Sequence, residues 1–234
     1  MDEAKIDIGV VPGRKCFGLK NADLVELMEL YPGRFICFAG VDPHDPTEES
    51  MAEIDEYVVN GPCTGVVIEP CLSENEAPGK PPMTVDDPRV HPIYEKCQEI
   101  GVPLMISFGG LTNAALRYMS PIDIDNVAEK YPNLTIILAH GGCPWADVMC
   151  WIALRRANVY ISPDIYAMGG PGTVGYVAGA SQLVPEKILF GSAYPMTPMK
   201  EAVVRYMGLG IKEENLPKVM YQNAARILGL DVEA

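Results

Sequence analysis

The stretch LTIILAHGGCPW, residues 134–145, decides the fold class of this chain. An unbroken apolar run ends in His140, two glycines follow, and Pro144 stands where a helix would begin. Such a run is typical of a strand buried on both faces of a parallel sheet. Glycines allow a tight turn after the strand, and proline suits the first turn of a helix. The stretch therefore predicts a buried strand that delivers an imidazole to its carboxyl end, where α/β barrels and open α/β sheets bind their ligands.

The composition is that of an ordinary globular protein. The chain has 234 residues, of which 48% are hydrophobic and 21% are charged, so it is long enough for one large core. The net charge of −13, with scattered acidic residues, disfavours nucleic acid and anionic membranes as partners. No apolar run approaches the roughly 18 residues that span a bilayer, and no apolar signal region follows residues 1–5. Seven cysteines without a C-x-x-C pair favour a reducing cytoplasm over a disulfide framework.

Apolar runs alternate with helical patterns along the whole chain. The expected strands are residues 6–11, 35–41, 65–70, 102–107, 134–139, 159–162 and 188–191. The expected helices are residues 21–30, 49–59, 91–100, 123–130, 146–157 and 174–180, and a helical tail covers about 199–230. Connections of ordinary length and a uniform composition predict a single domain over residues 1–234.

This rhythm predicts an α/β protein with a TIM-type (β/α) barrel, and a doubly wound open sheet is the alternative. No G-x-G-x-x-G follows the first strand, which disfavours a dinucleotide-binding version of the alternative. A closed barrel has eight strands, whereas about seven are found here, so we expect the first strand to be missing before Met1. The unpaired edges of an incomplete barrel would invite association, so we expect a homo-oligomer.

Polar residues follow the expected strands, and barrels build their chemistry at these positions. The residues are Arg14, Asp42, Glu69, Ser107, His140, Asp164 and Ser192 or Ala193. Arg14, Asp42 and Asp164 have a purely structural interpretation as turn or capping residues. Glu69 is harder to dismiss, because a carboxylate that ends a buried strand needs a partner. His44 and His91 lie in loop contexts rich in Pro or Asp, and we expect them at the surface.

Two further features lie near these strand ends. The loop at residues 71–88 is long for a compact domain, which makes it a candidate lid or substrate loop. Cys143 lies one turn from His140 and is a candidate thiol nucleophile, although no second histidine is near in sequence to activate it.

Three segments resemble the amidohydrolase-related, metal-dependent TIM-barrel hydrolases and decarboxylases: IILAHGG at 136–142, LFGSAYP at 189–195 and NAARILGL at 223–230. The resemblance spans nearly the whole chain, in order, and implies the barrel fold. It also implies metal ligands: a His-x-His pair on the first strand, histidines on the fifth and sixth, and an aspartate on the eighth. Only His140 matches, at the sixth strand, while Ser107 and Ala193 stand at the fifth and eighth positions.

The resemblance therefore points to a divergent branch that lacks most of the usual metal ligands. Serine and alanine cannot replace an imidazole and a carboxylate in a catalytic zinc site, which takes three protein ligands. Loss of the aspartate also removes the usual general base. Glu69, His140 and Asp164 could form a rearranged site for zinc or manganese. Equally, they could work without a metal, with His140 as acid or base and Arg14 holding a substrate carboxylate.

We therefore expect an amidohydrolase-like enzyme, a hydrolase or carboxy-lyase, that acts on a small-molecule substrate with a carboxylate group. The expected catalytic residues are His140, Asp164 and Glu69, the expected substrate-binding residues are Arg14, Ser107 and Tyr194, and His140 and Glu69 would be the metal ligands. The alternative is a catalytically inactive barrel that binds a small molecule or a partner subunit.

Overall fold

Six parallel strands form one curved sheet in the computed structural model, which describes residues 1–45, 47–111 and 113–231. The strands are β1 (Gly9–Pro12), β2 (Phe35–Gly40), β3 (Gly65–Ile68), β4 (Leu104–Ser107), β5 (Ile136–Ala139) and β6 (Val159–Ser162). The helices are α1 (Asn21–Leu30), α2 (Thr47–Ile54), α3 (His91–Ile100), α4 (Pro121–Lys130), α5 (Ala146–Arg155), α6 (Thr173–Ala178), α7 (Met199–Met207) and α8 (Asn223–Leu228).

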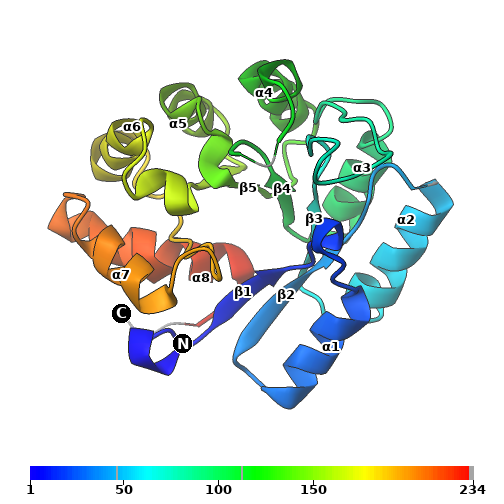
Figure 1. Cartoon of the computed structure of the whole chain (residues 1–234), viewed down its shortest axis with the longest axis horizontal. Coiled ribbons are helices and arrows are strands. Elements are labelled where there is room, and N and C mark those ends of the chain that lie inside the picture. The colour runs from blue at the N-terminus through cyan, green and yellow to red at the C-terminus, as the bar shows by residue number, and fades with distance from the viewer. Residues whose placement is uncertain (46, 112, 232–234) are drawn as a thin grey trace.

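The order of the strands decides between the two predicted folds. Each strand pairs with the next strand along the chain, from β1 to β6, and most of the helices surround the outer side of the sheet (Figure 1). A doubly wound sheet would reverse its strand order and carry helices on both faces. The TIM-type barrel is therefore confirmed, in the form of an open arc of strands.

The predicted seventh strand, residues 188–191, is wrong as a strand of the sheet. Ile188 makes one isolated parallel bridge with Ile161. The N–H of Leu189 donates to the carbonyl of Ile161 at 2.8 Å, but the next N–H, of Phe190, donates to Val219 at 2.8 Å. Because the backbone bonds to the C-terminal segment after a single bridge, no regular ladder forms beside β6.

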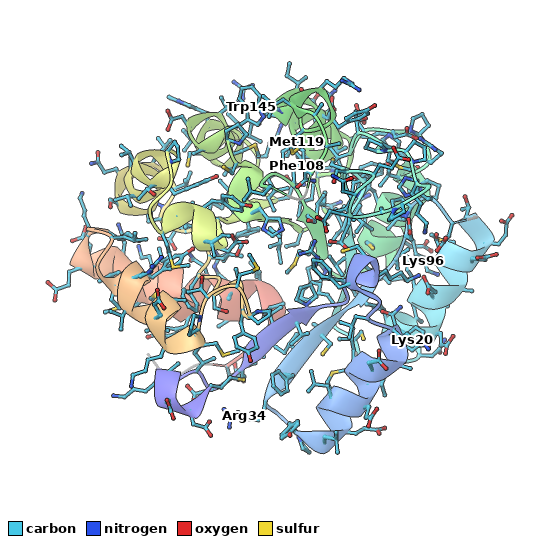
Figure 2. All side chains as sticks on the ribbon, viewed as in Figure 1. Lys20, Arg34, Lys96, Phe108, Met119 and Trp145 are labelled. Carbon is cyan, nitrogen blue, oxygen red and sulfur yellow. The ribbon has the colours of Figure 1, made fainter. Side chains whose placement is uncertain are left out.

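The sheet separates two apolar layers. The outer layer lies between strands and helices and includes Phe108 and Met119, which Figure 2 shows on the inner side of α4. The inner layer consists of one residue from each of β2 to β6, and Leu189 beside the isolated bridge: Phe38, Val67, Met105, Ile137, Tyr160 and Leu189. The apolar side chains of α8 pack against this inner layer. Helix α8 lies between α7 and β1 (Figure 1), so it covers the concave face of the sheet where the arc is open.

The same alternation places the polar residues of the carboxyl ends. Side chains in a strand point to opposite faces in turn, so residues two positions beyond the inner apolar layer also face inward. These include Glu69 just after β3, Ser107 at the end of β4 and Ser162 at the end of β6. Ser107 pairs in register with Ala139, and Ala139 pairs with Ser162. The inner face is therefore apolar in its middle and polar at the carboxyl ends of the strands.

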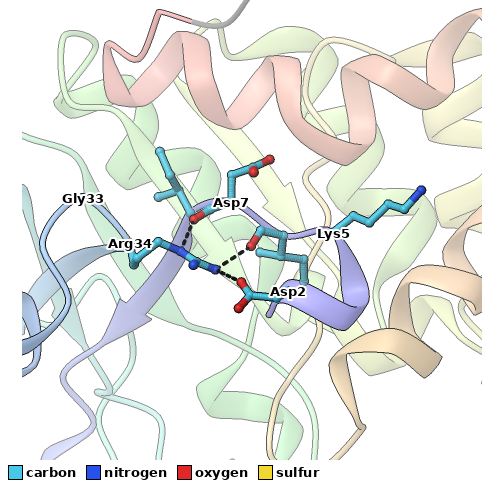
Figure 3. A pocket seen from close by; sticks show the side chains of 7 residues that line it. Asp2, Lys5, Asp7, Gly33 and Arg34 are labelled. Carbon is cyan, nitrogen blue, oxygen red and sulfur yellow. Dashed lines mark hydrogen bonds and ion pairs between the residues drawn. The ribbon is translucent and has the colours of Figure 1, made fainter.

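The opposite end of the sheet carries a surface cavity of about 630 Å³ next to Arg34 (Figure 3). Arg34 Nη2 donates to the carboxylate of Asp2 at 2.6 Å, and Arg34 Nε donates to the carbonyl of Asp7 at 2.9 Å. These bonds tie the N-terminal segment to the start of β2, which is a structural role. Among the described residues, no helix is long and apolar enough to cross a membrane.

Candidate active site

His140 and Asp164 form a hydrogen-bonded pair at the ends of β5 and β6. Asp164 Oδ2 lies 2.7 Å from His140 Nδ1 and accepts the backbone N–H of His140 at 3.2 Å. A carboxylate at Nδ1 places a proton on that nitrogen, so Nε2 of the neutral ring keeps its lone pair. The side chains of His140 and Asp164 are 18% and 9% exposed, so solvent screens the pair only weakly. This arrangement suits an imidazole that accepts and donates protons at Nε2.

The backbone at these strand ends is strained. His140, Asp164 and Ala193 have φ angles of 66°, 44° and 52°, in the left-handed region that favours glycine. Among the described residues other than glycine, only Lys5 shares this conformation. Each such residue costs about 1 kcal/mol or more, and strain of this kind gathers at functional sites. The ends of β5 and β6, and the segment that follows the Ile188 bridge, therefore carry backbone strain of the kind found at functional sites.

Three tyrosines contact the residues at the ends of β5 and β6. The hydroxyl of Tyr176 donates to the carbonyl of Gly141 at 3.2 Å, and that of Tyr206 donates to the carbonyl of Asp164 at 3.1 Å. The ring of Tyr166 meets the His140 ring edge to face, with centroids 5.9 Å apart. Burial raises the pKa of all three phenols, so each hydroxyl keeps its proton. Sequence reasoning missed these residues, because no local pattern marks a tyrosine that contacts another strand end.

Arg14 and Glu69 form a second pair across the ends of β1 and β3. Arg14 Nε donates to the carboxylate of Glu69, whose side chain is 9% exposed. Arg14 Nη2 also lies 3.8 Å from Cys16 Sγ, and the guanidinium stacks over the Phe17 ring at 4.7 Å. Arg14 is thus the partner that the buried carboxylate requires. The carboxyl ends of parallel strands meet at the same edge of the sheet, so both pairs lie at one barrel mouth.

Two buried polar atoms near these pairs have no hydrogen-bond partner in the described part of the chain. They are Ser107 Oγ and Asp164 Oδ1, on residues that are 2% and 6% exposed. Leaving a buried polar atom unpaired costs about 1–3 kcal/mol. Each atom therefore lacks a partner that a polar group could supply, and the substrate contact at Ser107 stays a prediction.

The two predicted metal ligands, His140 and Glu69, bind different side chains in this structure. Glu69 pairs with Arg14, and His140 Nδ1 bonds to Asp164. Within residues 1–45, 47–111 and 113–231, no group of three or more His, Cys, Asp or Glu side chains is placed to hold a metal ion. Because catalytic zinc takes three protein ligands, the donors do not fit such a centre as arranged. Metal binding by this chain stays a prediction.

The remaining site predictions have mixed outcomes. Tyr194 is 63% exposed, and its backbone N–H donates to Ser192 Oγ at 3.2 Å, so its substrate role stays a prediction. Burial and the nearby Asp164 raise the pKa of the Cys143 thiol, which disfavours the nucleophilic thiolate. The surface prediction for His44 and His91 is wrong, because their side chains are only 12% and 15% exposed. His44 is held between Asp42 and Pro81, and His91 lies between Asp86 and Tyr131.

Two decarboxylases of known structure share the fold at low sequence identity. A 5-carboxyvanillate decarboxylase from Sphingomonas paucimobilis is 20% identical over 99% of this chain and 81% of that chain, with a TM-score of 0.70. A dihydroxybenzoic acid decarboxylase from a Polaromonas species, solved with manganese and an inhibitor, is 17% identical over 100% of this chain and 85% of that chain, with a TM-score of 0.68. Both agree with the barrel architecture.

A relative of higher sequence identity and a match to a family model show to which family this chain belongs. An uncharacterized TIM-barrel protein from Bordetella bronchiseptica is 33% identical over 98% of this chain and 80% of that chain, with a TM-score of 0.88. No curated protein matches the chain. The model of the amidohydrolase family matches residues 7–230, which confirms the predicted hydrolase or carboxy-lyase type at the level of the family. The chain belongs to the amidohydrolase family.

Proposed function

We propose that this protein decarboxylates or hydrolyses a small carboxylated molecule at the carboxyl ends of its strands, with His140 as the proton-transfer group. One observation carries the proposal: Asp164 Oδ2 lies 2.7 Å from His140 Nδ1. Both residues stand on strained backbone, and two tyrosine hydroxyls donate to the carbonyls of Gly141 and Asp164, so the pair is held in a defined orientation. Asp164 fixes the tautomer and stabilises the imidazolium that forms when Nε2 takes a proton.

Both reactions use the His140 imidazole, which first accepts a proton in hydrolysis and first donates one in decarboxylation. In hydrolysis, Nε2 accepts a proton from water as the water oxygen bonds to the substrate carbonyl carbon, and then returns that proton to the leaving group as its bond to the carbonyl carbon breaks. In decarboxylation, the protonated ring donates from Nε2 to the carbon whose bond to the carboxylate breaks, and carbon dioxide leaves. That carbon keeps the electron pair of the broken bond, and the ring regains its proton from solvent. Proton transfer by a positioned side chain contributes about 100-fold or more to a rate.

The substrate carboxylate would bind near Arg14 and Ser107. Arg14 has five N–H donors and gives Nε to Glu69, so its outer nitrogens remain for a carboxylate. The hydroxyl of Ser107, which has no hydrogen-bond partner among the described residues, ends β4 beside β3, the strand that Glu69 follows, and would supply a further polar contact. The two named decarboxylases with this fold act on phenolic carboxylic acids, so we take small aromatic acids as the first substrate class to test.

A panel assay tests the proposal. The panel contains phenolic benzoic acids, measured for release of carbon dioxide, and carboxylated esters and lactones, measured for release of acid. We expect turnover of at least one class, and a loss of about 100-fold or more in His140→Asn. His91→Asn is the matched control, because His91 lies between Asp86 and Tyr131 and apart from the site.

The same panel separates the inactive alternative. A ligand that raises the melting temperature and is recovered unchanged would indicate a binding protein and would contradict the enzymatic proposal. The homo-oligomer stays a prediction, based on the unpaired edge of β1, and light scattering of the purified protein measures it.

A further inference from the structure

Residues 70–83 form a loop whose two ends are fixed. The N–H of Met83 donates to the carbonyl of Pro70 at 3.0 Å, which closes the loop at its base. Leu72 and Met83 are buried, while residues 73–82 between them are exposed or half-buried. Within residues 73–82, the backbone hydrogen bonds belong to local turns, such as those from the N–H groups of Glu76 and Ala77 to the carbonyl of Ser73. This segment of residues 73–82 is therefore anchored at its base and has little internal structure to hold it in place.

The segment has one polar attachment to the rest of the molecule. In the described part of the chain, all of its non-local hydrogen bonds and ion pairs go to residues 42–45. Lys80 binds the carboxylate of Asp42 and lies 3.7 Å from that of Asp45. His44 Nε2 lies 2.8 Å from the carbonyl oxygen of Pro81. These contacts hold one side of the loop against the end of β2.

A cavity of about 420 Å³ lies beneath the attached loop. The strand ends contribute Lys15, Val67 and Glu69 to its lining, and the loop contributes Ala77 and Pro78 among others. The cavity thus borders Glu69, the acidic partner of Arg14. The cavity is partly open, and movement of residues 73–82 would open it further to solvent.

His44 faces a hydrogen-bond acceptor at each ring nitrogen. Nδ1 lies 2.9 Å from the Asp42 carboxylate, and Nε2 faces the Pro81 carbonyl. A neutral imidazole has one N–H, so both bonds can form only when the ring is doubly protonated. The hydrogen bond to Asp42 is the main cause that raises the pKa of His44, against burial and the nearby Lys80. The other charged groups around it are Asp45 on the same loop, Asp87 across from it, and Lys15, which lies 3.6 Å from Asp45.

We propose that residues 73–82 are a lid over the cavity beside Glu69, closed by the His44 imidazolium between Asp42 and Pro81 and by Lys80 on Asp42, and released when His44 loses its proton. The proposal rests on the proposed function only in treating the cavity as part of the substrate's route. Because the His44 pKa is raised in the closed state, closure is fully favoured below the ordinary histidine pKa of about 6.5. Closure is lost as the pH rises through the raised pKa of His44.

Amide hydrogen exchange on the whole protein tests the lid. Protection of the amides in residues 73–80 is measured at about pH 6 and about pH 9 and corrected for the intrinsic exchange rates. We expect about tenfold stronger protection at the lower pH, because a hydrogen bond to a charged group is lost at the higher pH. His44→Gln should lower protection at about pH 6 and abolish the difference between the two conditions. His91→Gln is the control and should behave as the wild type.

A second variant separates the two parts of the closure. Lys80→Met removes the other cation on Asp42 from an exposed position, so we expect weaker protection with the pH difference retained. Equal protection at the two pH values, or an unchanged pH difference in His44→Gln, would overturn the proposal. If His44→Gln also lowers the protection of the β5 amides, the variant has destabilised the whole fold. The pH difference of the wild type and the result in Lys80→Met then decide the outcome. No turnover is measured, so failure of the lid and failure of the proposed reaction are distinguished.

Discussion

One carboxylate oxygen of Asp164 bonds to His140 twice, at the backbone N–H and at Nδ1 of the ring. The first contact holds the left-handed turn that ends β5, and the second sets the tautomer of the ring. The side chain that positions the imidazole thus also stabilises the unusual backbone that presents it. Asp164 thus links the backbone strain at His140 to the protonation of the His140 ring.

Asp164→Asn tests this coupling. An asparagine oxygen can still accept the backbone N–H of His140, so the fold should persist. The amide has no charge to stabilise the imidazolium, so we expect kcat to fall by about 100-fold or more. Steady-state kinetics on a substrate from the panel measures the change. Asp147→Asn, in the exposed first turn of α5, is the control, and equal activity in the two variants would contradict the assigned role.

Tyr206→Phe tests the support beneath Asp164. The substitution removes the hydroxyl that donates to the Asp164 carbonyl and leaves that carbonyl without this partner. We expect the free energy of unfolding to fall by about 1–3 kcal/mol, measured by urea denaturation. Tyr31→Phe is the control, because Tyr31 is 55% exposed, and it should change stability by less than about 0.5 kcal/mol. Similar values for the two variants would show that the buried bond contributes little.

The main elements of the fold could be predicted because their signals are local. The boundaries of α1 and α3 agree with the prediction, since each follows an amphipathic pattern and ends near a proline or glycine. The run at residues 188–191 has the composition of a strand but forms only one bridge. The N–H of Phe190 in this run donates to the carbonyl of Val219. No local sequence pattern shows that a segment so far along the chain takes this hydrogen bond from the sheet.

The site could be predicted only as a set of strand ends. The apolar runs placed Glu69, His140 and Asp164 at the carboxyl ends, where the structure has them. Their pairing depends on contacts between distant residues: 24 positions separate His140 from Asp164, and 55 separate Arg14 from Glu69. The burial of His44 could not be predicted for the same reason, because Pro81, in the loop that covers it, lies 37 positions away.

Ala193→Gly tests the backbone strain at Ala193, in the segment that follows the Ile188 bridge. Ala193 has φ of 52°, a conformation that costs alanine about 1–2 kcal/mol and costs glycine almost nothing. We expect the variant to equal or exceed the wild type in stability, because the relief offsets the added freedom of the unfolded chain. Ala52→Gly, on an exposed turn of α2, should lose about 1 kcal/mol. Equal losses in urea denaturation would mean that Ala193 is not strained.

The Arg14–Glu69 pair predicts a non-additive double variant. Arg14→Met alone leaves the Glu69 carboxylate buried without its partner, so we expect a loss of about 3 kcal/mol. Adding Glu69→Met should recover most of this loss, because two apolar side chains can fill the space without a buried charge. A double-mutant cycle in urea measures the coupling. Additive losses would show that the pair does not act as a unit.

The most direct test of proton transfer by the His140–Asp164 pair compares the turnover of the wild type with that of His140→Asn, both treated with a chelator. The donors His140 and Glu69 are each held by another side chain, so we assign proton transfer to the His140–Asp164 pair and derive no step through a metal. We expect the treated wild type to keep its turnover and His140→Asn to lose about 100-fold or more. Loss of wild-type turnover on chelation with recovery on adding manganese, or unchanged turnover in His140→Asn, would contradict this assignment.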